Sequence, residues 1–181
     1  MDKLTKEEWY LSNDPQILKI QNKCLDYMDQ FNSIPHSASK AQKEILKKMM
    51  GSIGENSTVV APFYANWGGK FVYIGDHVYI NYHLTCVDDA PIYIDDYVQI
   101  GPNCTLAVAM HPLDPEMRKQ GYQMNKPIHI CKNVWLGANV TVLAGVTIGE
   151  NSVIGAGSIV TKDIPANVVA YGNPCKIQKS I

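Results

Sequence analysis

The chain of 181 residues has little of what would direct it to a polyanion or a bilayer. It carries 16 basic and 17 acidic residues, and Arg118 is its one arginine, so it lacks the basic surface that nucleic acid binding needs. No apolar run approaches the length of a membrane-spanning helix, and the first residues do not read as a signal peptide. We therefore expect neither nucleic acid nor membrane as a partner.

Cysteine is also sparse, with five residues and no Cys-x-x-Cys pair. An odd number of widely spaced cysteines does not describe a disulfide framework. Cys86 and Cys104 fall at apolar positions of a repeat described below, which favours small core residues in a reducing compartment. The sequence thus predicts a cytoplasmic protein with free thiols.

A period of six residues is the dominant pattern that is present. After Ile130, an aliphatic residue returns every six positions, and a second column of mostly aliphatic residues runs four positions behind it. Neither an α-helix nor a flat strand requires this period. It is typical of a parallel β-helix, in which short strands wind around a prism and stack coil upon coil. The two columns are Ile130, Leu136, Val142, Ile148, Ile154, Val160 and Val134, Val140, Val146, Ser152, Ser158, Ile164.

The same period runs upstream from Ile74 to Cys86 and from Ile94 to Leu106, with a phase slip of two residues between the runs. Residues 111 to 127 are polar and proline-bearing, and they interrupt the repeat. We expect a loop extruded from a prism corner, and loops of that length are usually functional.

The pattern predicts a mainly β protein in one compact unit. Residues 52–172 form about six coils, residues 1–51 form a helical cap, and residues 173–181 form a tail. Apolar spacing predicts one helix from Pro15 through Phe31 and a second from residue 39 to 50. Glycine follows the aliphatic residue at several corners, where it would permit a positive φ.

His111 is the candidate for catalysis because it ends a repeat and opens the extruded loop. A neutral imidazole at a corner, clear of the core, can act as a general base toward an alcohol. Position alone equally allows an ordinary surface histidine.

Five motifs in order give the chain a resemblance to the maltose/galactoside O-acetyltransferases. They are N-Y-H-L-T-C-V-D-D at 81–89, H-P-L-D at 111–114, N-V-W-L-G at 133–137, G-A-G-S-I-V-T-K-D-I-P at 155–165 and G-N-P-C-K at 172–176. The resemblance implies a left-handed β-helix, a homotrimer with active sites between subunits, and acetyl-coenzyme A (acetyl-CoA) as donor.

The resemblance also places the family's catalytic base on His111. There it would take the proton of a sugar hydroxyl that attacks the thioester directly, without a metal or an acyl-enzyme. A backbone N–H in the segment of Ala138 would stabilise the oxyanion.

Acceptor positions of the family map onto Tyr79, Asn81 and Asp89. Each also has a structural interpretation: Tyr79 as surface packing, Asn81 as a corner residue, and Asp89 as part of a solvated turn. A further acidic contact near the N-terminus aligns loosely with Asp14, which a helix cap explains equally well.

Two positions depart from the family pattern. Gln123 stands where many relatives carry Glu, and as it cannot be a charged partner of the base we assign it no catalytic role. Trp67 stands where a smaller residue is common, so the identity of the acceptor stays open.

Donor positions of the family follow the loop. Small residues would leave room for the pantetheine arm, and lysines would meet the coenzyme phosphates. Lysine in place of arginine at the terminal positions keeps charge but loses bidentate phosphate binding. These positions are Trp135, Ala138, Ala156, Thr161, Lys162, Lys176 and Lys179.

Three alternatives remain from the sequence. A zinc enzyme of the γ-carbonic anhydrase type needs three histidines at one site, which the pairs His77/His83 and His111/His129 do not arrange. A non-catalytic β-helical scaffold would give His111 no special role. An acetyl-CoA-dependent transferase with another hydroxyl acceptor would keep it.

Overall fold

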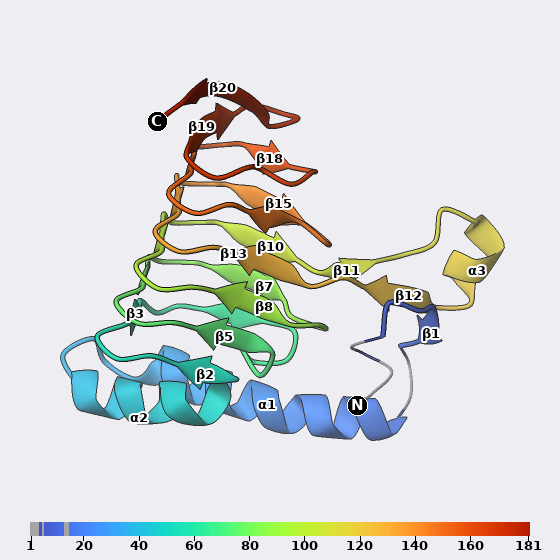
Figure 1. Cartoon of the computed structure of the whole chain (residues 1–181). Coiled ribbons are helices and arrows are strands. Elements are labelled where there is room, and N and C mark those ends of the chain that lie inside the picture. The colour runs from blue at the N-terminus through green and yellow to red at the C-terminus, as the bar shows by residue number, and fades with distance from the viewer. Residues whose placement is uncertain (1–3, 5, 13–14) are drawn as a thin grey trace.

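A computed structural model describes residues 4, 6–12 and 15–181, and it forms a left-handed β-helix of about six turns (Figure 1). Short parallel strands stack into three sheets, one on each face of a triangular prism. This confirms the fold class. One sheet holds β4 (Tyr64–Ala65), β7 (Thr85–Val87), β10 (Thr105–Ala107), β15 (Thr141–Leu143) and β18 (Ile159–Val160).

The other two faces are built the same way. The second sheet holds β2 (Ser52–Ile53), β5 (Val72–Ile74), β8 (Ile92–Ile94), β13 (Ile128–Ile130) and β16 (Thr147–Ile148). The third holds β3 (Thr58–Val59), β6 (Tyr79–Ile80), β9 (Gln99–Ile100), β14 (Trp135–Leu136), β17 (Val153–Ile154), β19 (Val168–Tyr171) and β20 (Lys176–Ser180).

The core is the stack of inward side chains that the six-residue period predicts. Residues of the two predicted columns are buried along the whole prism, and pairs such as Leu136 with Ile154 and Val142 with Val160 are in register. Cys86 and Cys104 are buried in the same core, and all five cysteines are free thiols. The inward face is therefore mostly apolar, as expected for buried parallel strands, and Ser152 and Ser158 are the buried polar members of the predicted columns.

The corners use glycine and asparagine differently from the prediction. Gly137 and Gly149 do not adopt a positive φ; a Cβ there would lie 2.7 Å and 2.3 Å from the backbone nitrogen of the next coil. Glycine at these positions allows close approach of successive coils. The left-handed conformation is taken mainly by asparagine, histidine and tyrosine, with φ between 57° and 61°. These residues are Asn56, His77, His83, Tyr97, Asn103, Asn133, Asn139, Asn151 and Asn167.

Two helices cover the first coil, α1 (Pro15–Ser33) and α2 (Ser39–Met49), and Figure 1 shows them along the base of the prism. Asn32 of α1 donates to the carbonyl of Phe63 at 2.8 Å and accepts from its N–H at 2.9 Å, which pairs an open strand edge. Asp14, the expected cap, lies outside the described residues. None of the described helices is long and apolar enough to cross a membrane.

The interruption of the repeat is an arm of residues 109–126 that projects from one side of the prism (Figure 1). The arm is more ordered than the aperiodic loop expected from the sequence. It contains β11 (Ala109–Met110), α3 (Pro115–Lys119) and β12 (Tyr122–Asn125), and β12 also pairs with β1 (Tyr10–Leu11). The N–H of Lys126 donates to the carbonyl of Val108 at 2.9 Å and closes the base of the arm.

The C-terminal residues cover the other end of the prism. β20 turns back and pairs antiparallel with β19, so the last coil does not present a long parallel edge. Lys176 and Lys179 lie on this terminal strand and are exposed.

Candidate active site

His111 lies at the end of β11, where the chain enters the arm, and its side chain is exposed. Its Nδ1 lies 3.0 Å from the carbonyl oxygen of Tyr122. Because a carbonyl oxygen can only accept, Nδ1 must carry the hydrogen in the neutral ring. Nε2 then holds the free lone pair, which is the tautomer that a general base at Nε2 requires.

The arm holds this imidazole through a compact turn. Asp114 caps α3 by accepting from the N–H of Met117 at 2.8 Å. Arg118 donates from Nη1 to the carbonyls of Pro112 and Leu113 at 2.9 Å and 3.0 Å. The single arginine therefore orders the segment that follows His111.

A polar network lies beside His111 on the arm. Ala109 and Met110 pair with Asn125 and Met124, and this register, continued by one residue, sets His111 opposite Gln123. Gln123 is buried and donates to the hydroxyl of Tyr10 and to the side-chain oxygen of Asn125, both at 2.9 Å. No catalytic role was predicted for Gln123, and in the structure its amide links Tyr10 and Asn125 within the network.

Asp89 faces a cavity of about 200 Å³ at this network. One oxygen accepts from Nδ2 of Asn66 at 2.9 Å and the other from Nε1 of Trp67 at 3.1 Å. These two hydrogen bonds fix the orientation of the Asp89 carboxylate, and its remaining lone pairs are available to a ligand in the cavity. The cavity is lined by Leu4, Tyr10, Ser12, Ile17, Gln21, Asn66, Trp67, Asp89 and Gln123.

The neighbouring Asp88 is fully buried and holds the turn before β5. Its two oxygens accept from the N–H groups of Trp67 at 2.7 Å and Gly69 at 3.1 Å. Burial raises the pKa of Asp88 to about 7, although the backbone N–H of Trp67 works in the opposite direction. Burial likewise raises the pKa of Tyr10 to about 12, so its phenol stays neutral in the network.

These two aspartates correct one sequence expectation. The solvated-turn interpretation of Asp88 and Asp89 is wrong, because both are buried and hydrogen-bonded. The pair of buried donors at Trp67, its N–H and its Nε1, could not be inferred from the repeat.

The other expected acceptor residues lie elsewhere on the same chain. Tyr79 is on β6, in the third sheet, and is exposed. Asn81 follows β6, and its Oδ1 accepts from the N–H of Tyr82 at 2.8 Å. Neither residue lines the cavity of Asp89, so one chain does not bring the three predicted acceptor residues together.

Three of the expected donor residues, Trp135, Ala138 and Ala156, form a column on the prism. Trp135 on β14 is 55% exposed and pairs in register with Val153 of the next coil. Ala138 and Ala156 occupy equivalent corners of successive coils, where the N–H of Gly157 donates to the carbonyl of Ala138 at 2.8 Å. Thr161 and Lys162 directly follow β18, near the end of the prism that β20 covers, and both are exposed.

The comparisons with known proteins cover the whole chain. A family profile described as bacterial transferase hexapeptide (six repeats) matches residues 127–162, and one described as maltose acetyltransferase hexapeptide capping motif matches residues 3–54. A galactoside O-acetyltransferase of Lactococcus lactis subsp. lactis is 51% identical over 97% of this chain and 84% of its own length.

Solved structures agree with these relatives. A galactoside acetyltransferase in complex with coenzyme A has a TM-score of 0.93 and 42% identity, covering 97% of this chain and 87% of its own. A maltose O-acetyltransferase from Clostridium difficile 630 has a TM-score of 0.96 and 36% identity, covering 99% and 96%. From the repeat, the capping motif and these similarities, the chain belongs to the hexapeptide-repeat maltose/galactoside O-acetyltransferase family.

Proposed function

We propose that the chain transfers an acetyl group from acetyl-CoA to a hydroxyl of a sugar, with His111 as the general base. The observation that carries the role of His111 is the contact of Nδ1 with the carbonyl of Tyr122, because it leaves Nε2 as the basic nitrogen. The relatives named as galactoside and maltose O-acetyltransferases support the class of acceptor.

The proposed reaction is a direct transfer. Nε2 of His111 takes the hydroxyl proton as the hydroxyl oxygen attacks the thioester carbonyl carbon, and the resulting imidazolium returns that proton to the departing sulfur. A backbone N–H in the segment of Ala138 would donate to the oxyanion of the tetrahedral intermediate. Holding both substrates at one base converts the reaction into an intramolecular one.

The cavity of Asp89 is the proposed seat of the sugar. A carboxylate anchored by Asn66 and Trp67 can accept from a sugar hydroxyl without reorienting, and Gln123 adds a polar wall. Its volume of about 200 Å³ and the indole of Trp67 favour a small acceptor, such as a single sugar ring, within one chain. Tyr79 and Asn81 are proposed to contact the acceptor from a neighbouring chain.

The coenzyme is proposed to lie along the column of Trp135, Ala138 and Ala156, with its phosphates near the lysines at the C-terminal end. The relative solved with coenzyme A supports this class of donor. The small side chains of half-buried Ala138 and exposed Ala156 leave space beside the backbone for the pantetheine arm, and Thr161, Lys162, Lys176 and Lys179 are all exposed.

We propose that a homotrimer brings these groups together, because they are separated on a single chain. His111 follows β11 of the arm, and Asp89 shares a cavity with Gln123 of the arm, whereas Tyr79 and Trp135 belong to the third sheet and Asn81 directly follows β6. Figure 1 shows β3 and β19 of that sheet on the side of the prism away from the arm. Two halves on different sides of one chain can share a site only if a second copy contributes one of them. A ring of head-to-tail contacts closes such an assembly.

The test is thiol release from acetyl-CoA in the presence of mono- and disaccharides. His111→Ala is expected to lower kcat by about 10²–10⁴-fold, since a positioned base contributes that much. His77→Asn is the matched control, because asparagine tolerates the left-handed φ of 58° at that corner. Equal rates in wild type and His111→Ala would remove the mechanism, and no transfer to any sugar would favour another hydroxyl acceptor or a scaffold.

A further inference from the structure

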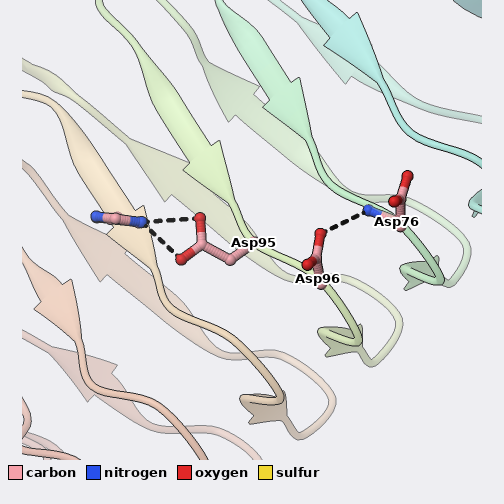
Figure 2. Close-up of polar contacts among 4 residues, drawn as sticks. Asp76, Asp95 and Asp96 are labelled. Atoms are coloured by element: carbon pink, nitrogen blue, oxygen red, sulfur yellow. Dashed lines mark hydrogen bonds and ion pairs between the residues drawn. The ribbon is translucent and has the colours of Figure 1, made fainter.

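Three side chains with metal-binding atoms meet on the outer surface of the second sheet, away from the arm network. Nε2 of His129 lies 2.9 Å from each oxygen of Asp95, and the ligand atoms of Asp95, His129 and Cys131 all lie within 4.8 Å of one another. Figure 2 shows both Asp95 oxygens directed at one imidazole nitrogen. All three residues are half-buried.

Asp95 and Cys131 occupy corner positions that hold glycine on the other coils of the second sheet. Ile53, Ile74, Ile94, Ile130 and Ile148 stack in register down the second sheet. The residue after each one forms a second column, which reads Gly54, Gly75, Asp95, Cys131 and Gly149.

The two departures from glycine are therefore neighbours in the stack. They fall on the coil before the arm and the coil after it. His129, which points outward from β13 between them, completes the group.

The surrounding contacts hold the group in place. The N–H of Asp95 donates to the carbonyl of Ile130, and that of Cys131 donates to the carbonyl of Ile148, both at 2.9 Å. The ring of Tyr93 packs edge-on against His129 with centroids 5.7 Å apart. Asp96 is not part of the group, because its carboxylate accepts from the N–H of Asp76 at 2.9 Å (Figure 2).

The donor set selects a class of metal. One imidazole nitrogen, one carboxylate oxygen and one thiol sulfur suit Zn²⁺, whereas Mg²⁺ and Ca²⁺ prefer oxygen alone. Zinc bonds of about 2.0–2.3 Å set tetrahedral ligands about 3.2–3.8 Å apart. The ligand atoms, which lie within 4.8 Å of one another, are close to that spacing, and the 2.9 Å contact of His129 with Asp95 would have to open slightly to admit the ion.

We propose that Asp95, His129 and Cys131 bind one Zn²⁺ ion, with water in the fourth position. The ion ties together the two coils between which the arm is inserted. The site takes no part in acetyl transfer, and its existence does not depend on the proposed function.

The test uses metal-free, full-length protein titrated with Co²⁺, which replaces Zn²⁺ and reports its ligands by absorption. Wild type is expected to bind one equivalent, with tetrahedral cobalt bands and a thiolate-to-cobalt charge-transfer band that Zn²⁺ removes. Cys131→Ser is expected to lose the charge-transfer band and more than about tenfold in affinity. Cys175→Ser, which changes another half-buried thiol, is the matched control and should behave as wild type.

Stability gives an independent readout of the same site. Saturating Zn²⁺ should raise the Tm of wild type and of Cys175→Ser, and should leave the Tm of His129→Gln and Cys131→Ser unchanged. The proposal is overturned if wild type binds no Co²⁺, or if the charge-transfer band survives in Cys131→Ser. A zinc-dependent rise in Tm that persists in both site variants would also overturn it.

Discussion

At the scale of single residues, adjacent aspartates acquire different roles from their surroundings. Asp88 is sealed beneath the turn of Trp67 to Gly69, whereas Asp89 opens onto a cavity. The sequence shows two consecutive acidic residues, one alanine and then a proline, which is typical of an exposed turn. Their burial depends on the indole of Trp67 and on the N-terminal segment, which are distant in sequence, so no local signal could have revealed it.

The pH dependence of stability should identify Asp88. Its pKa is raised from 3.8 to about 7 in the folded state, so folding favours the protonated form. The stability that this group contributes is fully present below about pH 4 and is lost as the pH rises through about 7. The difference in unfolding free energy between wild type and Asp88→Asn should therefore change between pH 4 and 7, by up to about 4 kcal/mol.

Urea denaturation at fixed protein concentration measures that difference. Asparagine lacks the titration and loses one acceptor for the two backbone donors, so the variant is less stable by an amount that varies with pH. A constant difference across this range would assign the pH dependence to other groups. Asp96→Asn, at an exposed turn on the second sheet, serves as the control.

At the scale of elements, the six-residue period predicts most of the fold, and individual residues show which features it does not predict. The buried columns from Ile130 to Val160 are confirmed because the period records which side chains face inward. The reason for corner glycines was predicted incorrectly, since a repeat does not show whether φ or space is limiting. Within the arm, β12 escaped prediction because one of its pairing partners, β1, lies about a hundred residues earlier.

The corner rule can be tested at Gly149. A Cβ there would lie 2.3 Å from the backbone nitrogen of Ala166, and backbone cannot give way as a flexible side chain does. Gly149→Ala should cost about 1–3 kcal/mol of stability, as overpacking does.

Gly157→Asn is the matched control for this variant. Gly157 has a φ of 73° and an open site, so asparagine should change stability by less than about 1 kcal/mol. Chemical denaturation compares the two, and an equal loss in both would mean that conformation, rather than space, requires glycine at Gly149.

At the scale of the whole molecule, the family's site residues divide between two sides of one prism. Sequence resemblance assigns roles to His111 and Asn81 alike, but it cannot show which of them share a chain in the working site. Only an assembly of several chains would show this. The geometry of one chain shows only that the predicted residues do not come together within it. The cavity of Asp89 and the column of Ala138 and Ala156 are complementary halves under this proposal.

Mixing two inactive variants should restore activity if the halves come from different chains. His111→Ala removes the base, and Ala156→Trp fills the exposed corner proposed for the pantetheine arm. Each variant alone should be nearly inactive. After co-refolding, about one quarter of the interfaces should combine an intact base with an intact donor column, because each head-to-tail contact draws its halves from two chains.

The rate of acetyl transfer in the mixture decides this prediction. Recovery to a substantial fraction of wild type supports a site between chains. No recovery, with mixed oligomers demonstrated by differently tagged chains, would place base and donor column within a single chain.

The arm has one further consequence through its length. Ile94 pairs with Ile130 thirty-six positions later, whereas Ile130 pairs with Ile148 after eighteen, so the inserted stretch is as long as one full coil. Excising residues 109–126 would join Val108 to Pro127 without shifting any inward side chain out of phase. The repeat and its histidine-bearing insert are thus separable in register, because the insert can be removed without changing the phase of the coils that follow it.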